Sequence, residues 1–264
     1  MAMYMAAEKF LAAHLGGRYQ EDGTPEVLTR LKEITVDPKT VTLTKKLDVL
    51  TVGVPKVAAD LRAGKYKYKA QIEVEGESMN IKMSTEIKEK NGAWWVTDQI
   101  GMLMMSMKDT AVLEKGSLVV LKRSMSEAGS KVDIAFSGTR VTGLIKMQGK
   151  KSEIDLEIGG PVFGEGPGYA QVIACLPLEE GYSAVFRNFD IQKQKPRAMR
   201  LEVARSEEVE VPAGKFDTFR VELTSAEGGP ERSTVWVSKD DRRAVKFATV
   251  MPELGGARIE AELN

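Results

Sequence analysis

Residues 209–241 read VEVPAGKFDTFRVELTSAEGGPERSTVWVSKDD, and this stretch decides the fold class. Apolar and polar residues alternate from Phe219 to Leu223 and again from Val235 to Val237. A period of two is typical of β-strands with one face on the core. Gly228–Pro230 separates the two runs and predicts the turn between them, and Pro212–Gly214 predicts a tight corner before the first. The stretch therefore indicates antiparallel β structure.

The same alternation occupies much of the chain upstream. It runs from Tyr66 to Val74 and from Met79 to Ile87, with a turn at Glu75–Glu77 between the two runs. Strict alternation gives each strand one dry and one solvated face, which is typical of antiparallel sheets and not of parallel sheets covered by helices. Asn91–Gly92 is a strong hairpin signal. Further alternating runs occupy residues 132–136, 141–147, 154–158, 183–189, 198–203, 244–251 and 257–263.

These runs amount to about a dozen short strands, a number and spacing typical of meandering antiparallel folds. In a flat sheet, so many strands would leave long exposed edges, which curvature or closure protects. We therefore predict a mainly β fold, a large curved antiparallel sheet or barrel-like meander with one or two N-terminal helices. A chain of 264 residues is long enough to bury such a core.

The first fifty residues follow a different pattern. The spacing of apolar residues predicts an amphipathic helix over 2–15, and Gly16–Gly17 supplies its end. Capping and apolar spacing predict a second helix over 25–34. We expect two parts: a helical segment with an extended linker over residues 1–50, and an antiparallel β domain over residues 51–264.

The N-terminal segment resembles the C-terminal tail of bacterial prolyl-oligopeptidase-family serine peptidases. Over about the first 40 residues, Leu15–Arg18 match a leucine–glycine–glycine–arginine motif that ends the last helix of those enzymes, and an acidic, proline-containing segment follows. The resemblance implies that a hydrolase core with its catalytic serine, aspartate and histidine would precede Met1. His14 lies in the tail helix and does not match the catalytic histidine.

The remainder resembles a bacterial family known as domain of unknown function 3108. The resemblance rests on Leu176–Leu178 with Gly181–Tyr182, on Val211–Thr218 (VPAGKFDT), and on Val235–Asp240 (VWVSKD). It covers about the last 200 residues, and Val245–Lys246 and Gly255–Gly256 continue it. It implies antiparallel β structure and no established catalytic residues. It also implies a bacterial envelope location, periplasmic or extracellular after removal of a leader, with a cytoplasmic location as the alternative.

Composition excludes several classes of partner. The 38 basic and 38 acidic residues give a net charge of zero, so the chain has no long-range attraction to a phosphate backbone, and we expect no nucleic-acid partner. No apolar run is long enough for a transmembrane segment. The single histidine, His14, and single cysteine, Cys175, provide no zinc or haem ligand set, so we expect no metal and no cofactor.

Catalytic signatures are absent from the sequence. No Gly-x-Ser-x-Gly motif occurs, and a serine–histidine–aspartate triad would have to recruit His14 from the N-terminal helix. Gly164–Gly168 is rich in glycine but lacks the Lys-Ser/Thr ending of a phosphate-binding loop. We therefore favour a non-catalytic protein. A hydrolase of esters or peptides, with a site assembled only by the fold, is the alternative.

Residues 101–109, GMLMMSMKD, carry four methionines and allow two interpretations. Flexible thioethers suit an adaptable apolar pocket, and they also suit a core strand. We expect an apolar concavity that could hold an apolar small molecule or lipid, beside a fused or partner peptidase. A third hypothesis is a protein–protein interaction domain that uses its sheet edges. The residues expected to line the concavity are Trp94, Trp95, Met102, Met104, Tyr182, Phe186 and Trp236.

Overall fold

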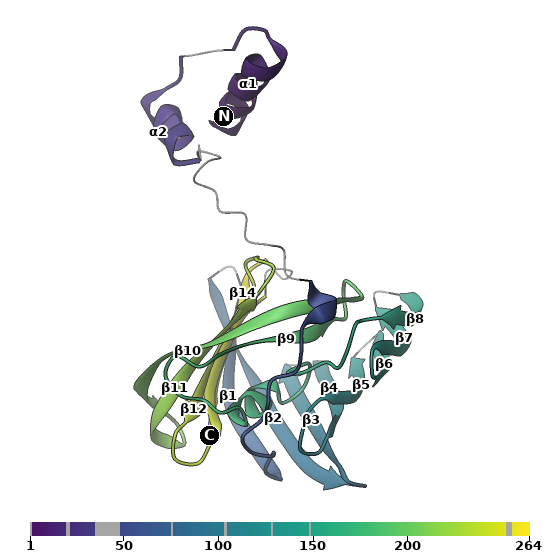
Figure 1. Cartoon of the computed structure of the whole chain (residues 1–264). Coiled ribbons are helices and arrows are strands. Elements are labelled where there is room, and N and C mark those ends of the chain that lie inside the picture. Colours follow the sequence, from purple (N-terminus) through teal and green to yellow (C-terminus); the bar gives the residue numbers. More distant parts are fainter. Residues whose placement is uncertain are drawn as a thin grey trace. The chain divides into compact units, whose positions relative to one another are not determined.

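The computed structural model describes residues 2–19, 22–34, 48–74, 76–102, 105–127, 129–147, 149–251 and 255–264. The chain forms two compact units, residues 1–46 and 47–264 (Figure 1). The first contains α1 (Ala2–Leu15) and α2 (Pro25–Ile34), which confirms both predicted N-terminal helices. Gly16 and Gly17 adopt positive φ directly after α1, and the Val27 N–H donates to Thr24 Oγ1 (3.4 Å) at the start of α2.

The second unit is built on one fully antiparallel sheet of 14 strands. Its order is β8-β7-β6-β5-β4-β3-β2-β1-β14-β13-β12-β11-β10-β9, so two meanders join where β1 pairs with β14. The two end strands, β8 and β9, do not pair with each other in the described part of the chain, and the sheet is not closed into a barrel. The predicted fold class is confirmed. The strands are β1 (Gly64–Val74), β2 (Glu77–Lys90), β3 (Ala93–Met102), β4 (Met105–Glu114), β5 (Val120–Glu127), β6 (Ser130–Ser137), β7 (Arg140–Met147), β8 (Lys150–Glu157), β9 (Ser183–Asp190), β10 (Lys195–Val211), β11 (Gly214–Ser225), β12 (Arg232–Ser238), β13 (Ala244–Met251) and β14 (Ala257–Leu263).

The stretch from 209 to 241 forms the end of β10, all of β11 and all of β12. Val211 pairs with Gly214 across the tight corner, and Val221 lies between Val203 of β10 and Val235 of β12. All four of these valines are buried. Because side chains alternate along a strand, each row of buried residues defines what we call the inner face of the sheet, and the residues between them define its outer face.

The inner face is filled by the chain itself. Residues 158–178, which we call the plug, connect β8 to β9 and include α3 (Tyr169–Ala174). Figure 1 shows α3 enclosed by the curved sheet. The Gln171 amide donates to Tyr68 Oη (2.7 Å), and the rings of Phe163 and Phe186 meet edge to face at 5.4 Å. The concavity predicted from the strand pattern is therefore largely occupied by the plug.

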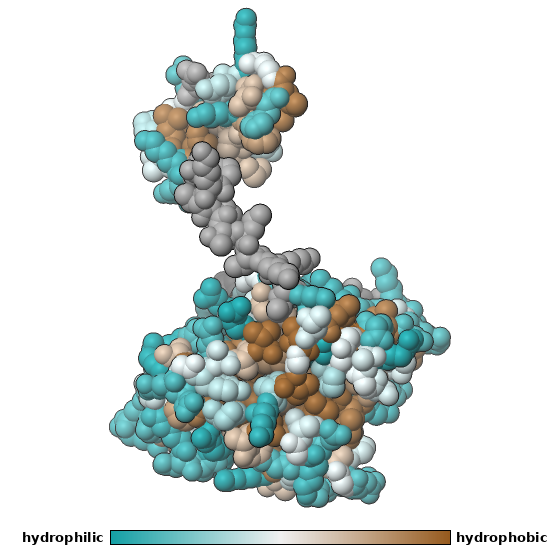
Figure 2. All heavy atoms as spheres, viewed as in Figure 1, coloured by the Kyte–Doolittle hydropathy of each residue, from teal (hydrophilic) through white to brown (hydrophobic). Residues whose placement is uncertain are grey.

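A second segment, residues 48–63, crosses the plug, and we call it the strap. It contains the short 3-10 helix η1 (Val49–Thr51). The Arg187 guanidinium donates to the carbonyls of Val49 (3.2 Å) and Leu50 (2.9 Å), and the Trp94 indole N–H donates to Asp60 (2.6 Å). Apolar residues gather along the middle of this face, with hydrophilic residues around them (Figure 2).

Candidate binding site

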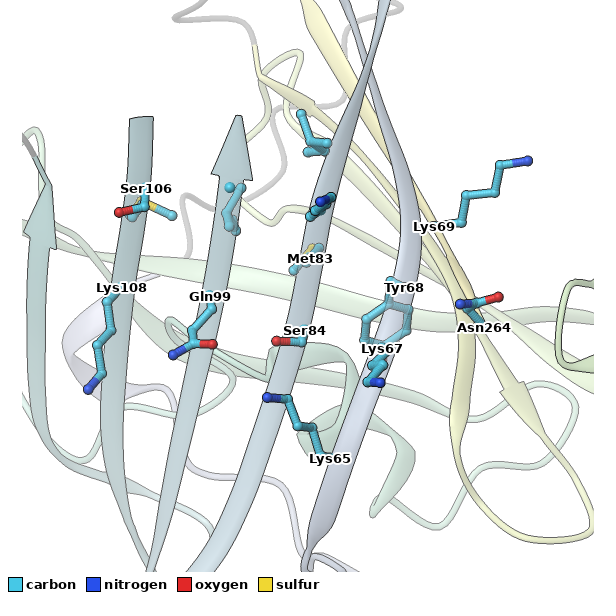
Figure 3. A pocket seen from close by; sticks show the side chains of 15 residues that line it. Lys65, Lys67, Tyr68, Lys69, Met83, Ser84, Gln99, Ser106, Lys108 and Asn264 are labelled. Carbon is cyan, nitrogen blue, oxygen red and sulfur yellow. The ribbon is translucent and has the colours of Figure 1, made fainter. Parts of the chain in front are cut away.

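Two parts of the β unit offer space for a ligand, one on each face of the sheet. On the outer face, a hollow of about 790 Å³ lies over β1–β4 (Figure 3). On the inner face, two cavities of about 260 and 190 Å³ share the lining residues Glu165 and Arg197, so they adjoin each other. We describe the inner cavities first because they lie on the face for which a ligand was predicted.

The larger inner cavity lies between the two ends of the sheet. Met125 of β5 and Met147 of β7 line it from one side, and Phe189 of β9, Ile191 and Arg197 of β10 line it from the other. The smaller cavity lies between the plug and strands β9–β13, and it is lined by Tyr169, Phe186, Met199 and Leu223 among others. The site therefore combines apolar walls from both meanders with polar groups of the plug.

Methionines gather on the inner face near the turns that join β1 to β2, β3 to β4, β5 to β6, β7 to β8 and β13 to β14. In an antiparallel meander these alternate turns lie at one end of the sheet. Unlike the valines and isoleucines of the core, most of these methionines are only partly buried. A flexible, polarizable side chain that stays accessible on an inner face suits an adaptable apolar lining. The described residues of this set are Met79, Met83, Met107, Met125, Met147 and Met251.

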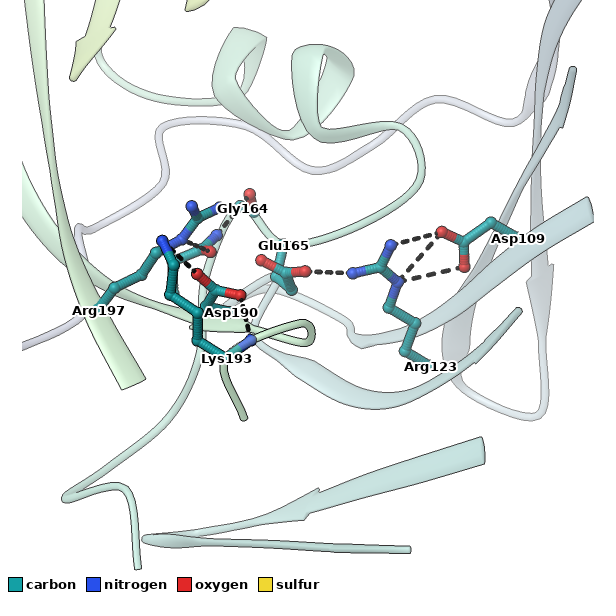
Figure 4. A network of polar contacts seen from close by, with 8 residues as sticks. Asp109, Arg123, Gly164, Glu165, Asp190, Lys193 and Arg197 are labelled. Carbon is teal, nitrogen blue, oxygen red and sulfur yellow. Dashed lines mark hydrogen bonds and ion pairs between the residues drawn. The ribbon is translucent and has the colours of Figure 1, made fainter. Parts of the chain in front are cut away.

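A buried network of charges anchors the plug beside the cavities (Figure 4). The Arg123 guanidinium donates to both oxygens of Asp109, with the shortest contact at 2.7 Å, and forms an ion pair with Glu165 of the plug. Arg197 donates to Asn188 (2.8 Å) and pairs with Glu231 (2.7 Å). Burial raises the pKa of Glu165, although the neighbouring positive charges of Arg123 and Arg197 oppose that shift.

Asp98 binds the middle of the plug, at Gly168 directly before α3. Its carboxylate accepts a hydrogen bond from Thr85 Oγ1 (2.6 Å) and another from the Gly168 N–H (3.0 Å). Burial raises the pKa of Asp98 to about 6, although both hydrogen bonds favour the charged form. Gly168 has a φ of +66°, and a Cβ there would lie 2.3 Å from Val96 Cγ1, so only glycine fits this approach.

The polar groups of the smaller cavity include three hydroxyls that bond one another. Hydroxyls of Tyr169, Thr249 and Ser233 form a chain with contacts of 2.9 and 3.1 Å along the smaller cavity. Burial raises the pKa of the Cys175 thiol to about 12, which disfavours a nucleophilic thiolate. Across the described ranges, no three His, Cys, Asp or Glu side chains are placed to hold a metal ion. Within the same ranges, no helix has the length and apolar character needed to cross a membrane.

The residues predicted to line the concavity lie in several places. Phe186 lines the smaller cavity, and Trp94 is buried on the inner face against the strap. The strand register places Trp95 and Trp236 on the outer face of the sheet, and Tyr182 is half-buried just before β9. The side chains of Met102 and Met104 fall outside the described residues. That these seven residues bind a ligand stays a prediction.

The sequence reasoning missed the polar half of the site. Arg123, Glu165 and Arg197 were not singled out, and neither were Met125 and Met147. A signal was present for Met147, which stands at the end of the alternating run over residues 141–147. Glu165 could have been noticed as a carboxylate between two glycines of the plug.

Two solved structures are similar to this chain. A β-barrel-like protein of domain of unknown function DUF1849 from Brucella abortus superposes with a TM-score of 0.50 at 9% identity, covering 80% of this chain and 98% of that one. The hypothetical lipoprotein YmcC from Escherichia coli gives a TM-score of 0.33 at 10% identity, covering 80% of this chain and 89% of that one.

Sequence comparison gives the family. No curated protein matches the chain. Residues 56–262, which include the described strands of the sheet except the last residue of β14, match the family described as "Protein of unknown function (DUF3108)". The chain therefore belongs to the DUF3108 family.

Proposed function

We propose that this chain is a non-catalytic binding domain that holds an apolar or amphiphilic small molecule in the inner cavities. The observation that carries the proposal is the set of inward-facing, partly exposed methionines, with Met125 and Met147 lining the larger cavity. Together, the two adjoining cavities reach the range of roughly 300–1,000 Å³ that is usual for small-molecule sites.

The polar groups beside the cavities support an amphiphile over a pure hydrocarbon. Arg197 lines both cavities and is about a quarter exposed, so it can meet the polar end of a ligand while the methionines meet the apolar end. Its partner Glu231 lines the larger cavity as well. A ligand carboxylate or hydroxyl would compete with Glu231 for the guanidinium.

Binding of the neutral fluorophore N-phenyl-1-naphthylamine tests the proposal, with dodecanoate as competitor. We expect the folded protein to enhance the fluorescence of the probe, and dodecanoate to displace it. The double variant Met125→Gln/Met147→Gln should weaken binding at least tenfold, because amides replace two apolar contacts. Leu121→Gln is the matched control, since Leu121 is exposed and does not line either cavity. Absence of binding, or equal binding by the double variant and the control, would contradict the proposal.

The two alternatives have less support. A hydrolase would have to use the hydroxyls of Ser233, Thr249 and Tyr169, and in the described part of the smaller cavity these bond one another with no histidine beside them. Pairing through sheet edges is disfavoured because Lys150, Lys151, Glu153, Asp155 and Glu157 charge the β8 edge. Turnover of a short-chain ester that is lost in Ser233→Ala would revive the first alternative.

We further infer an envelope location, and we keep the peptidase association as a proposal for the N-terminal unit. The location rests on the family resemblance, and the association rests on Leu15–Arg18 alone. The proposed boundary, with the helical segment over 1–50 and the β domain over 51–264, is testable by limited proteolysis. Fractionation of cells that produce the protein, with periplasmic and cytoplasmic markers, tests the location, and co-purification of a serine peptidase tests the association.

A further inference from the structure

The outer face of β1–β4 concentrates positive charge around the hollow of about 790 Å³. Fifteen residues line it, and the strand register places ten of them on the outer face of the sheet (Figure 3). The lining contains lysines and no aspartate or glutamate side chain. Across the described residues, no ion pair involves any of these lysines, although such pairs are frequent elsewhere on the sheet. The lysines are Lys65, Lys67, Lys69, Lys82 and Lys108.

Carboxylates near the rim are already paired. Glu86 lies opposite Lys65 in the register but contacts Lys88 at 2.9 Å, and the Lys88 hydrogen bond is the main cause that lowers the pKa of Glu86. Glu262 lies opposite Lys69 but contacts Lys246 at 2.8 Å. In the described residues these lysines therefore form no close ion pair, and Glu86 attracts Lys65 and Lys108 only at longer range.

The arrangement of the lysines carries a cost that a ligand would relieve. Lys69 and Lys82 are direct cross-strand neighbours, and like charges directly opposite each other destabilise a sheet. The next row runs Lys67–Ser84–Gln99–Lys108 across four strands, so a lysine stands at each end of it. An anion between these rows would turn repulsion into attraction.

Small residues form the floor of the hollow and leave space above the strands. Ser84, Gly101 and Ser106 occupy outward positions on β2, β3 and β4. Gly101 is not among the glycines with positive φ, and the nearest atom to a Cβ placed there is Lys82 Cβ at 4.0 Å. Neither backbone conformation nor packing therefore requires glycine. A strand glycine of this kind costs stability and marks a place where another group approaches closely.

We propose that this hollow binds a hydroxylated phosphate ester. Lys69 and Lys82, with Lys67 and Lys108, would hold the phosphate, since lysine ammonium groups bind phosphate as point charges. The hydroxyls of Ser84 and Ser106 and the amides of Gln99 and Asn264 line the same hollow and would bond the hydroxyl groups of the ligand. The protein has zero net charge, so the attraction is local to this site.

The same chemistry occurs in soluble glycerol phosphate and in a phosphatidylglycerol head group, and the test has one arm for each. Calorimetry with glycerol 1-phosphate measures the soluble ligand, and co-sedimentation with phosphatidylglycerol vesicles, against phosphatidylcholine vesicles, measures the lipid surface. Both are done at an ionic strength of about 0.15 M, where the Debye length is about 8 Å. Binding in the first arm assigns a soluble ligand, and binding in the second alone assigns a lipid head group. Binding in neither arm overturns the proposal.

Two double variants distinguish binding at this hollow from non-specific attraction to basic charge. Lys69→Gln/Lys82→Gln should weaken binding at least tenfold while the protein stays folded, because it removes a like-charge pair. Lys131→Gln/Lys146→Gln removes the same charge from another outward cross-strand lysine pair that does not line the hollow, and it should bind like the wild type. Equal loss in both variants would reduce the result to non-specific attraction and overturn the proposal.

A third variant tests the floor without changing charge. Gly101→Val should fill the space beside Lys82 and weaken binding of the phosphate ester, with the fold retained because a β-branched residue suits a strand. Binding of N-phenyl-1-naphthylamine to the inner cavities should be the same in all three variants. The proposal for the outer hollow and the proposal for the inner cavities can therefore be contradicted independently of each other.

Discussion

The two faces of strands β1–β4 carry opposite chemistry on alternate residues. On the inner face, Asp98 and Asp109 are buried, and the plug or a neighbouring strand supplies a partner for each. On the outer face, lysines such as Lys69 and Lys82 surround a hollow and have no partner among the described carboxylates. The comparison teaches that charge on one face fixes the position of the plug, whereas charge on the other is available to a ligand.

Removal of Arg123 should have the largest effect. Its side chain is 13% exposed and lies between Asp109 and Glu165, which are 6% and 7% exposed. Arg123→Met would leave two buried carboxylates without their cation, a change that costs about 3–5 kcal/mol of unfolding free energy. Urea denaturation followed by circular dichroism measures the loss.

Two further variants sharpen this prediction. Arg140→Met breaks the exposed pair of Arg140 with Asp155 and should leave the urea midpoint almost unchanged, since exposed pairs contribute little. The triple variant Arg123→Met/Asp109→Asn/Glu165→Gln removes all three charges together and should recover part of the lost stability. If Arg123→Met proves no worse than Arg140→Met, the network does not fix the plug.

Asp98 predicts a pH dependence from the inner face. Its folded-state pKa of about 6 lies above the ordinary value of 3.8, so the folded protein binds the proton more tightly than the unfolded chain does. The stabilisation is therefore complete below pH 3.8 and is lost as pH rises through about 6. A shift of this size corresponds to about 3 kcal/mol.

Asp98→Asn isolates this contribution. An asparagine amide can accept from the Gly168 N–H and donate to Thr85 Oγ1, so the contacts of Asp98 can be kept without its charge. The stability difference between the variant and the wild type should grow in favour of the variant between about pH 4 and pH 6, and level off above that. Urea unfolding at several pH values measures it, with the exposed Asp155→Asn as control. A constant difference across this window would show that Asp98 does not titrate there.

The alternation of residues was enough to predict which face each strand position would take. Tyr68 and Ile87 are buried as the pattern indicates, and Lys67 and Lys69 on either side of Tyr68 are exposed. It could not show that Arg123 meets Glu165, because the two are 42 positions apart and the contact depends on the plug entering the concavity. Within the plug the sequence shows the glycine-rich run Gly164–Gly168, and this run alone does not indicate what the segment packs against.

Strand register explains why the outer hollow could not be predicted from the sequence. Lys69 and Lys82 are both visible as polar positions in the sequence, but only the pairing of β1 with β2 puts them side by side. A slip of one residue would send an entire strand face to the other side. The outer hollow therefore depends on a set of pairings between four strands that turn residues alone do not determine.

Alanine substitutions at two glycines, Gly168 packed on the inner face and Gly101 on the outer face, allow a direct comparison of the two faces. Gly168→Ala should destabilise the protein by about 2–3 kcal/mol, because alanine is strained at positive φ and its Cβ would overlap Val96 in the packed interior. Gly101→Ala on the outer face meets only Lys82 Cβ at 4.0 Å, an ordinary van der Waals contact, and should stabilise β3 by about 0.5 kcal/mol. Thermal unfolding of both variants tests the prediction, and similar losses at the two sites would contradict it.

Lys82→Glu should have only a small effect on stability, and the sign of that effect is the informative quantity. Lys69 lies directly opposite, so the substitution converts a repulsive cross-strand pair into an attractive one, and we expect a gain of about 0.2–1 kcal/mol. The same change places a negative charge in the hollow and should abolish binding of glycerol 1-phosphate and of phosphatidylglycerol vesicles. A side chain whose removal improves folding and destroys binding is retained for the ligand. If Lys82→Glu instead lowers the unfolding free energy, the lysine has a structural partner, and the outer face does not differ from the inner one as proposed.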